Sequence, residues 1–279
     1  MVTLQSLSPG VATIDSATVT IPAGAYFVNT PTWLPNPVPT PGTAVLQASD
    51  PRSALYHYNT GSATVTVSEP ALNFSWTTQS LGIGQYIDNE YVTTAVNTPA
   101  PISVGFTHAG AVRIATDSNG TKIPVTGVTI PAGTYYQYFR VVGTSAGTDT
   151  LVANASAPPH FPDTAYTQVG LGRTDPIGSW PTSLSLGGTD SVLVTLYARD
   201  PAQNQRYVQD STTFTLAPNA NIQFVSGGAN SVVLTSVVIP ANAYYIQFYV
   251  KGVTAGTGSA TISATNYVTY NAPAITVTQ

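Results

Sequence analysis

The chain has 279 residues, of which 43% are hydrophobic and only 7% charged, and its formal net charge is −4. Eight basic residues leave no cationic stripe that could follow a phosphate backbone, which argues against nucleic-acid binding. The sequence contains no run of about 18 apolar residues, so we expect no membrane insertion. Because cysteine is absent, disulfides and thiolate metal sites are excluded, and the fold must rest on packing.

The tripeptide Ile-Pro-Ala returns at a fixed interval along the chain. It starts at Ile21, Ile130 and Ile239, so each copy begins 109 residues after the last (130 minus 21 and 239 minus 130). A regular return near the length of one small domain is typical of a tandem array of similar modules. The sequence therefore predicts between two and three copies of one module.

The local pattern is an alternation of apolar and polar residues, which is typical of half-buried β-strands. It is clearest at 63–67, 191–197 and 274–278, where Val, Ile, Thr and Tyr are frequent. The 23 Gly and 22 Pro residues interrupt these runs, as they do in β-sandwiches. No segment of helical length keeps a helical period without Pro or Gly. We therefore predict an all-β chain.

The second and third copies share a signature over 128–141 and 237–250. In each copy a strand ends at Ile-Pro-Ala, Gly133 or Asn242 follows, and an aromatic-rich strand comes next. Proline cannot donate to a β-ladder, and glycine or asparagine tolerates a positive φ angle, so the pattern predicts a tight corner. The residues expected on the core face of the second strand are Tyr135, Gln137, Phe139 and Val141 in one copy and Tyr244, Ile246, Phe248 and Val250 in the other.

The end of the last alternating strand in each copy gives the expected module boundaries. They divide the chain into modules at 1–69, 70–172 and 173–279. Trp76 and Trp180 fall shortly after the two internal boundaries, where an aromatic ring could fill the seam between neighbours.

The first module is shorter than the other two. By the 109-residue period its first residue corresponds to about residue 110, so it lacks opening strands equivalent to 76–107. Half a sandwich exposes strand edges and an apolar face. Either the chain is a segment of a longer polypeptide, or another copy donates the missing strands by β-augmentation.

At 8–14 and 19–24, and at the two later Ile-Pro-Ala sites, the chain resembles the bacterial immunoglobulin-like repeats, the Big-type modules of large surface proteins. The Pro-Ala-Gly corner, the aromatic-Val strand and the Ala-Gly-Thr strand start recur together in this order. The copies depart from the family in their tyrosine content and in a Pro-rich insertion at 31–37. The resemblance implies tandem Ig-like antiparallel β-sandwiches and an extracellular, cell-surface stalk, spacer or adhesive module. It does not identify a ligand.

The titratable residues form no catalytic pattern. His57, His108 and His160 are scattered, and none has a carboxylate at a recognisable spacing, so we predict no enzyme, no metal site and no cofactor. The segment 117–120 begins like a calcium loop but lacks the distal Glu, and a hairpin turn is the better interpretation.

The outward face of the aromatic-rich strand is the candidate contact surface, together with one Trp in the Pro-rich insertion. The candidate residues are Tyr136, Tyr138, Arg140, Tyr245, Tyr249 and Trp33. Tyrosine rings stack on sugar faces or pack against a neighbouring subunit. The alternative is that they are ordinary residues of a two-sided strand, covering their cross-strand neighbours.

Taken together, these patterns favour a non-enzymatic array of extracellular modules that serves as a stalk, spacer or filament component of a bacterial surface protein. Its expected partners are other copies of itself or neighbouring modules of a longer chain. One alternative is a carbohydrate-binding adhesin module, in which the tyrosine rows or Trp33 contact glycan. Another is a string of accessory domains of a secreted hydrolase.

Overall fold

The structure is a computed structural model that describes residues 1–28, 33–35, 41–52, 58–68, 70–118, 121–156, 159–175, 179–186, 191–227 and 231–279. Every regular element in these ranges is a β-strand, so the prediction of an all-β chain is confirmed. No helix in the described ranges is long and apolar enough to span a membrane. Contacts divide the chain into two compact units, residues 1–71 with 155–161 and residues 72–154 with 162–279.

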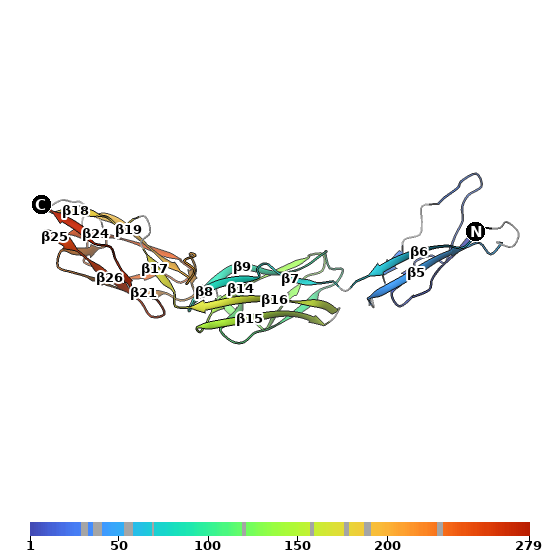
Figure 1. Cartoon of the computed structure of the whole chain (residues 1–279), viewed down its shortest axis with the longest axis horizontal. Helices are drawn as coiled ribbons and strands as arrows, with labels where there is room; N and C mark the ends of the chain where they lie inside the picture. The colour runs from blue at the N-terminus through green and yellow to red at the C-terminus, as the bar shows by residue number, and fades with distance from the viewer. Residues whose placement is uncertain are drawn as a thin grey trace. The chain divides into compact units, whose positions relative to one another are not determined.

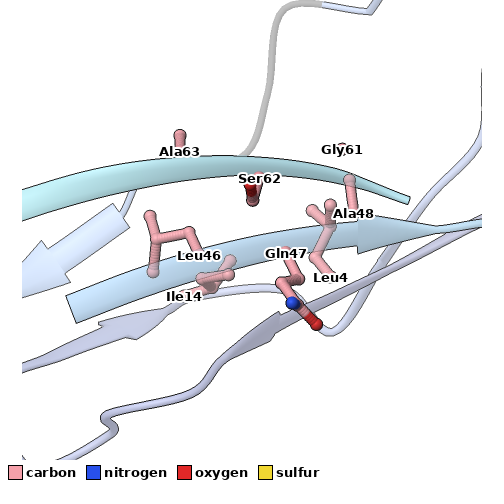
Figure 2. Close-up of a pocket in the computed structure, with 8 residues that line it drawn as sticks. All are labelled: Leu4, Ile14, Leu46, Gln47, Ala48, Gly61, Ser62 and Ala63. Carbon is pink, nitrogen blue, oxygen red and sulfur yellow. The ribbon is translucent and has the colours of Figure 1, made fainter. Parts of the chain in front are cut away.

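The first unit contains a four-stranded antiparallel sheet and a separate pair of strands. The sheet has the order β3 (Thr18–Val19), β1 (Val2–Ser6), β5 (Gly42–Ser49) and β6 (Gly61–Val67), and the pair is β2 (Ala12–Ile14) with β4 (Trp33–Pro35). Strands β5 and β6 lie side by side along their whole length (Figure 1). Leu4, Ile14 and Leu46 line an apolar groove of about 320 Å³ over this sheet (Figure 2).

The second repeat is a sandwich of two sheets. One sheet has the order β13 (Gly127–Ile130), β10 (Ile102–Thr107), β15 (Gly147–Ser156), β16 (Pro159–Gly170) and β8 (Thr78–Gly82), with β8 parallel to β16. The other has β12 (Thr121–Pro124), β11 (Val112–Ser118), β14 (Tyr136–Gly143), β9 (Gln85–Thr94) and β7 (Leu72–Phe74).

The third repeat has the same architecture in three smaller sheets. They are β17 (Arg173–Asp175), β19 (Val192–Arg199), β24 (Tyr245–Gly252) and β22 (Ile222–Val225); β23 (Ser236–Ile239), β21 (Thr212–Pro218), β26 (Ala260–Ser263) and β27 (Tyr270–Asn271); and β18 (Ser183–Ser185), β28 (Ile275–Thr278) and β25 (Gly256–Gly258). Strand β18 runs parallel to β28, as β8 runs parallel to β16.

The predicted corner is confirmed, and so are four of the eight predicted core residues, whereas Tyr244 and Ile246 of the third repeat are only half-buried. Gly133 and Asn242 have φ angles of 78° and 66°, the left-handed region that a tight corner requires. The core-facing residues Phe139, Val141, Phe248 and Val250 are all at most 2% exposed. Each repeat therefore buries the aromatic ring that the alternation places inward.

The start of the signature strand departs from the prediction. Tyr135 is 49% exposed and Gln137 is only half-buried, so neither belongs to the core of the second repeat. The strand begins at Tyr136, and Tyr135 still belongs to the corner, where its ring packs on Tyr136. Alternation holds only inside a strand, so it does not assign Tyr135, which precedes β14.

The two tryptophans at the predicted boundaries belong to the interiors of their own repeats. The ring of Trp76 lies 5.0 Å from that of Phe74, and the ring of Trp180 lies 6.2 Å from that of Phe224. The Trp180 indole also donates to the carbonyl of Pro273 at 2.8 Å. The ring of Trp180 packs inside the third repeat, so the prediction that it fills the seam with the second repeat is wrong. The prediction for Trp76, which concerns the first and second modules, stays a prediction.

The first repeat retains more of the pattern than its sequence period predicts. Strand β1 pairs with β3 as β10 pairs with β13, so β1 takes the place of β10. Between these strands the first repeat has the single strand β2, whereas the second repeat has the longer hairpin of β11 and β12, and a fixed period ignores that insertion. The prediction that 76–107 lacks any counterpart is therefore wrong for β10. Among the described residues of the first unit, no strand takes the place of β7, β8 or β9.

A buried carboxylate fixes the turn between β10 and β11. Asp149 accepts hydrogen bonds from the backbone amides of Ala109, Gly110 and Val112 at 2.6 to 2.9 Å. Burial alone would raise the pKa of Asp149, but the three amide donors outweigh burial and hold the pKa below its usual value.

We predict that Asp149 makes the second repeat sensitive to acid. A lowered folded-state pKa stabilises the fold fully above the unfolded pKa of about 3.9, and this stabilisation is lost as the pH falls through the folded pKa. Asp149→Asn should cost about 1–3 kcal/mol of unfolding free energy at neutral pH. It should also flatten the acid dependence of the urea midpoint between about pH 5 and pH 2. An equally steep acid dependence in the variant would contradict this role.

We predict that Phe248→Ala lowers the unfolding free energy of the third repeat by about 3–5 kcal/mol, because it opens a cavity in a dry core. Val238→Thr is the matched control, since Val238 is 43% exposed in the same repeat and threonine also favours strands. The control should shift stability by less than about 0.5 kcal/mol in urea unfolding. Equal effects from the two variants would show that Phe248 is not a core residue.

Candidate functional site

A sheet of the second repeat continues into the third repeat. Strand β20 (Tyr207–Val208) pairs antiparallel with β9, with Tyr207 opposite Tyr86 and Val208 opposite Gln85. The amide of Gln209 extends the ladder by donating to the carbonyl of Gly84 at 2.8 Å. Because Val208 is also fully buried in the core of the third repeat, this strand belongs to both repeats.

The loop before β20 is held by a buried carboxylate. Asp200 accepts from the backbone and side-chain nitrogens of Asn204 and from Nε of Arg206, each at 2.9 Å. Arg199 donates to the carbonyl of Gln203 at 2.7 Å and to Asp175 at 2.9 Å. These bonds fix the connection between β19 and β20, so that β20 is presented to β9 in one orientation.

The amide side chain of Gln85 is the centre of the junction. It is fully buried, and its Oε1 accepts from the backbone amide of Gly82 at 2.9 Å. Its Nε2 donates to the carbonyl of Arg199 at 2.9 Å and to the hydroxyl of Tyr267 at 3.0 Å. Burial raises the pKa of the Tyr267 phenol. Partners from both repeats are needed to satisfy this one amide.

Glycine allows the two repeats to approach closely. The amide of Gly172 donates to the carbonyl of Asn266 at 2.8 Å, and the Gly172 carbonyl accepts from the amide of Val268 at 2.8 Å. A Cβ atom on Gly172 would lie 2.7 Å from the ring of Tyr267, and one on Gly82 would lie 2.5 Å from Gln85. A side chain at Gly172 would therefore collide with Tyr267, and one at Gly82 would displace the Gln85 amide from its place in the junction.

Aromatic and polar contacts extend the junction over the outer face of β9. The rings of Tyr86 and Tyr207 are stacked at 5.4 Å, and the Tyr86 hydroxyl donates to Asn242 at 3.2 Å. Arg113 donates to the side chain of Gln209 at 2.8 Å. The second and third repeats are therefore joined by a ladder, a buried amide and a ring stack, a set of contacts that we call the junction.

A second feature is a hollow of about 180 Å³ lined by Tyr91, Tyr135, Tyr136 and Tyr138. Alternation places Tyr136 and Tyr138 on one face of β14, and the register sets Tyr91 of β9 opposite Tyr138. The Tyr136 ring lies 5.0 Å from the rings of both Tyr135 and Tyr138, and the Tyr91 ring lies 5.8 Å from that of Tyr138. We call this surface the tyrosine hollow.

The structure thus brings two of the predicted contact residues together, Tyr136 and Tyr138, and adds Tyr91 and Tyr135, which the sequence does not indicate. Tyr91 stands on a partner strand, so only the register between β9 and β14 reveals it. The alternation assigns Tyr135 to the core because it places the start of the strand too early.

The remaining predicted contact residues lie elsewhere. Arg140 is on the same strand face as the hollow, but it is paired with Asp88 at 2.5 and 2.8 Å. Tyr245 packs on the rings of Tyr244 and Tyr197, and Tyr249 packs against Gly227, both in the third repeat. The side chain of Trp33 lies outside the described part of the chain.

His108 is a described histidine that lies beside a carboxylate. His108 lies 3.6 Å from Asp149, which is occupied by the turn amides. Within the described ranges, no three His, Cys, Asp or Glu side chains are grouped as metal ligands would be. Strands β11 and β12 pair as far as Ser118 and Thr121, as the predicted hairpin requires, while residues 119–120 and His57 lie outside the described residues.

Comparison with known protein families and with curated proteins finds no match. Among solved structures, a β-glycosidase from Bacteroides vulgatus is 12% identical with a TM-score of 0.32, covering 76% of this chain and 25% of its own. Domains 4–9 of the surface layer protein SbsC are 16% identical with a TM-score of 0.30, and the match covers 100% of this chain and 39% of the SbsC chain. The Yersinia pseudotuberculosis adhesin InvE is 16% identical with a TM-score of 0.30, and the match covers 75% of this chain and 58% of the InvE chain. The chain therefore spans well under half the length of the first two proteins.

We predict that Gln85→Ala loosens the junction without unfolding either repeat. The change leaves the Gly82 amide, the Arg199 carbonyl and the Tyr267 hydroxyl without their partner, at a cost of about 1–3 kcal/mol for each group that water does not reach. Amide exchange should accelerate at Gln209, Gly172 and Val268, which donate across the junction, and stay slow at Phe139 and Phe248.

The matched control for this experiment is Gln79→Ala, which removes a half-buried glutamine that donates to Thr167 inside the second repeat. It should leave exchange at the three junction amides unchanged. Protection that persists at those amides in Gln85→Ala would refute the central role of the Gln85 amide.

Proposed function

We propose that this chain is a structural segment of a bacterial surface protein, in which consecutive sandwich repeats are held in a fixed relation to one another. The observation that carries the proposal is the junction between the second and third repeats, where β20 adds to a sheet of the preceding repeat. Spacer and stalk modules need such a connection, because a flexible linker transmits neither orientation nor distance.

The chemistry of the junction suits a connection between modules outside a cell. The contacts that cross between the repeats are backbone hydrogen bonds, one buried amide and stacked rings, and the cation Arg113 donates to a neutral amide oxygen. The ion pairs of Asp200 with Arg206 and of Asp175 with Arg199 lie within the third repeat. Contacts of this kind depend little on ionic strength, whereas surface ion pairs weaken as salt screens them. The junction should therefore hold in the variable medium outside a cell.

The rest of the molecule supports a scaffold and offers no reactive centre in its described part. The buried positions of the second and third repeats are filled by Val, Ile, Leu, Phe and Ala, as packing requires. The low charge of the chain reduces repulsion between neighbouring copies. The partners in this proposal are neighbouring modules or other copies of the chain, and its place is the cell surface.

A distance measurement on the full chain tests the proposal. Because the chain has no cysteine, Ser103→Cys and Thr261→Cys introduce two exposed labelling sites, one in the second repeat and one in the third. Double electron–electron resonance between spin labels at these two cysteines should give one narrow distance distribution, unchanged between low salt and about 1 M salt. The same labels in Gln85→Ala should give a broader distribution. A broad distribution in the unaltered junction would show that the repeats are flexibly tethered and would overturn the structural role.

A further inference from the structure

We propose that the tyrosine hollow of the second repeat is a binding site for an uncharged carbohydrate. The hollow is lined by Tyr91, Tyr135, Tyr136 and Tyr138, and its volume of about 180 Å³ suits one sugar ring with the chain continuing at either side. This inference goes beyond the structural role, because it gives the outer face of the repeat a ligand.

The four rings form the walls of the hollow, and two of them are open to solvent. Neighbouring rings meet edge to face at interplanar angles of 65° to 88°, which holds the rings in place against one another. Tyr135 and Tyr138 are 49% and 47% exposed. Sugar rings carry apolar C–H faces, and such faces pack favourably against the electron-rich face of an aromatic ring.

The phenol hydroxyls supply the polar half of a sugar site. In the part of the chain that the structure describes, none of the four hydroxyls makes a hydrogen bond to the protein. A phenol both donates and accepts, so four such groups around one hollow can meet the hydroxyls at a sugar's edge. An apolar partner would leave them without hydrogen bonds.

The charges beside the hollow favour a neutral sugar over an anionic one. Arg140, the nearest cation on the strand face, is already engaged by Asp88 in a two-bond pair. Glu90 lies next to Tyr91 in the chain and accepts a hydrogen bond from Ser75. No uncompensated cation therefore stands ready among these described residues to bind a carboxylate or a phosphate.

The third repeat shows that the hollow does not follow from the fold alone. Tyr138 and its partner Tyr91 correspond there to Gln247 and Thr195, which face each other in the same register. The side chain of Gln247 donates to Thr195 at 3.1 Å, and this polar pair stabilises the same strand contact without an aromatic wall. The second repeat thus carries two tyrosine rings where the third repeat carries a satisfied polar pair.

Affinity electrophoresis of the full chain tests this site. Native gels containing hydroxyethyl cellulose, xylan, galactomannan or glycogen should retard the protein in at least one case. Tyr136→Ala combined with Tyr138→Gln, which copies the third repeat at one position, should weaken that retardation at least about tenfold. Tyr166→Ala is the matched control, because Tyr166 is 47% exposed on β16, away from the hollow, and it should keep full retardation.

Urea unfolding of the double variant establishes that it is folded, so that lost retardation reports on the site. Three electrophoresis results would each overturn the proposal: no retardation in any of the four gels, full retardation of the double variant, or equal loss in Tyr166→Ala. Sedimentation velocity tests whether a second copy of the chain, rather than a carbohydrate, occupies the hollow. Concentration-dependent self-association that the double variant abolishes would assign the hollow to a second copy of the chain and refute carbohydrate binding.

Discussion

The organisation of the second and third repeats depends on one buried amide that neither repeat can satisfy alone. Gln85 has no exposed surface, and its three hydrogen bonds end on Gly82 in its own repeat and on Arg199 and Tyr267 in the next. Separating the repeats at this point leaves buried polar groups without partners until water enters, and each such group costs about 1–3 kcal/mol. The relation between the repeats is therefore specific, and intermediate arrangements are disfavoured.

Other parts of the junction make that amide contact reachable. Glycine at 82 and 172 lets backbone and side chains approach within van der Waals distance, and the Asp200 loop holds β20 where β9 can pair with it. Sheet continuation adds direction, because ladder bonds form only at a set spacing and angle. The short strand β20 thereby fixes the orientation of the third repeat relative to the second.

The repeats keep their interiors constant and vary their outer faces. Phe139 and Phe248 occupy equivalent buried positions, whereas Tyr138 and Gln247, their neighbours on the outward side, differ in chemistry. A strand that alternates inward and outward allows this, since a change on one face leaves the packing of the other intact. An array built in this way can carry a binding surface on one repeat while its scaffold remains unchanged.

The sequence predicted what depends on local pattern. The 109-residue return, the alternation, the Pro-Ala corner and the buried Phe139 and Phe248 are all visible in short windows of residues. Long-range pairing was not visible. Gln85 stands at a strand start and resembles a surface residue, and its burial follows only once Tyr267, 182 positions away, is in place.

Insertions and strand registers were the other features that the sequence did not reveal. Strand β20 has two residues and is too short to give a periodic signal. Tyr91 joins the tyrosine hollow only through the register between β9 and β14. The β11–β12 hairpin lengthens the second repeat, so a fixed period of 109 residues aligns the first repeat with the wrong strands. Each of these failures concerns which segments meet, a question that local propensity does not address.

Residual dipolar couplings measured on the full chain in a weakly aligning medium test the central claim most directly. If the junction joins the second and third repeats rigidly, backbone couplings from both repeats fit one alignment tensor with the same magnitude and orientation. Two tensors of different magnitude would show that the repeats reorient independently, and the rigid junction through Gln85 would be contradicted.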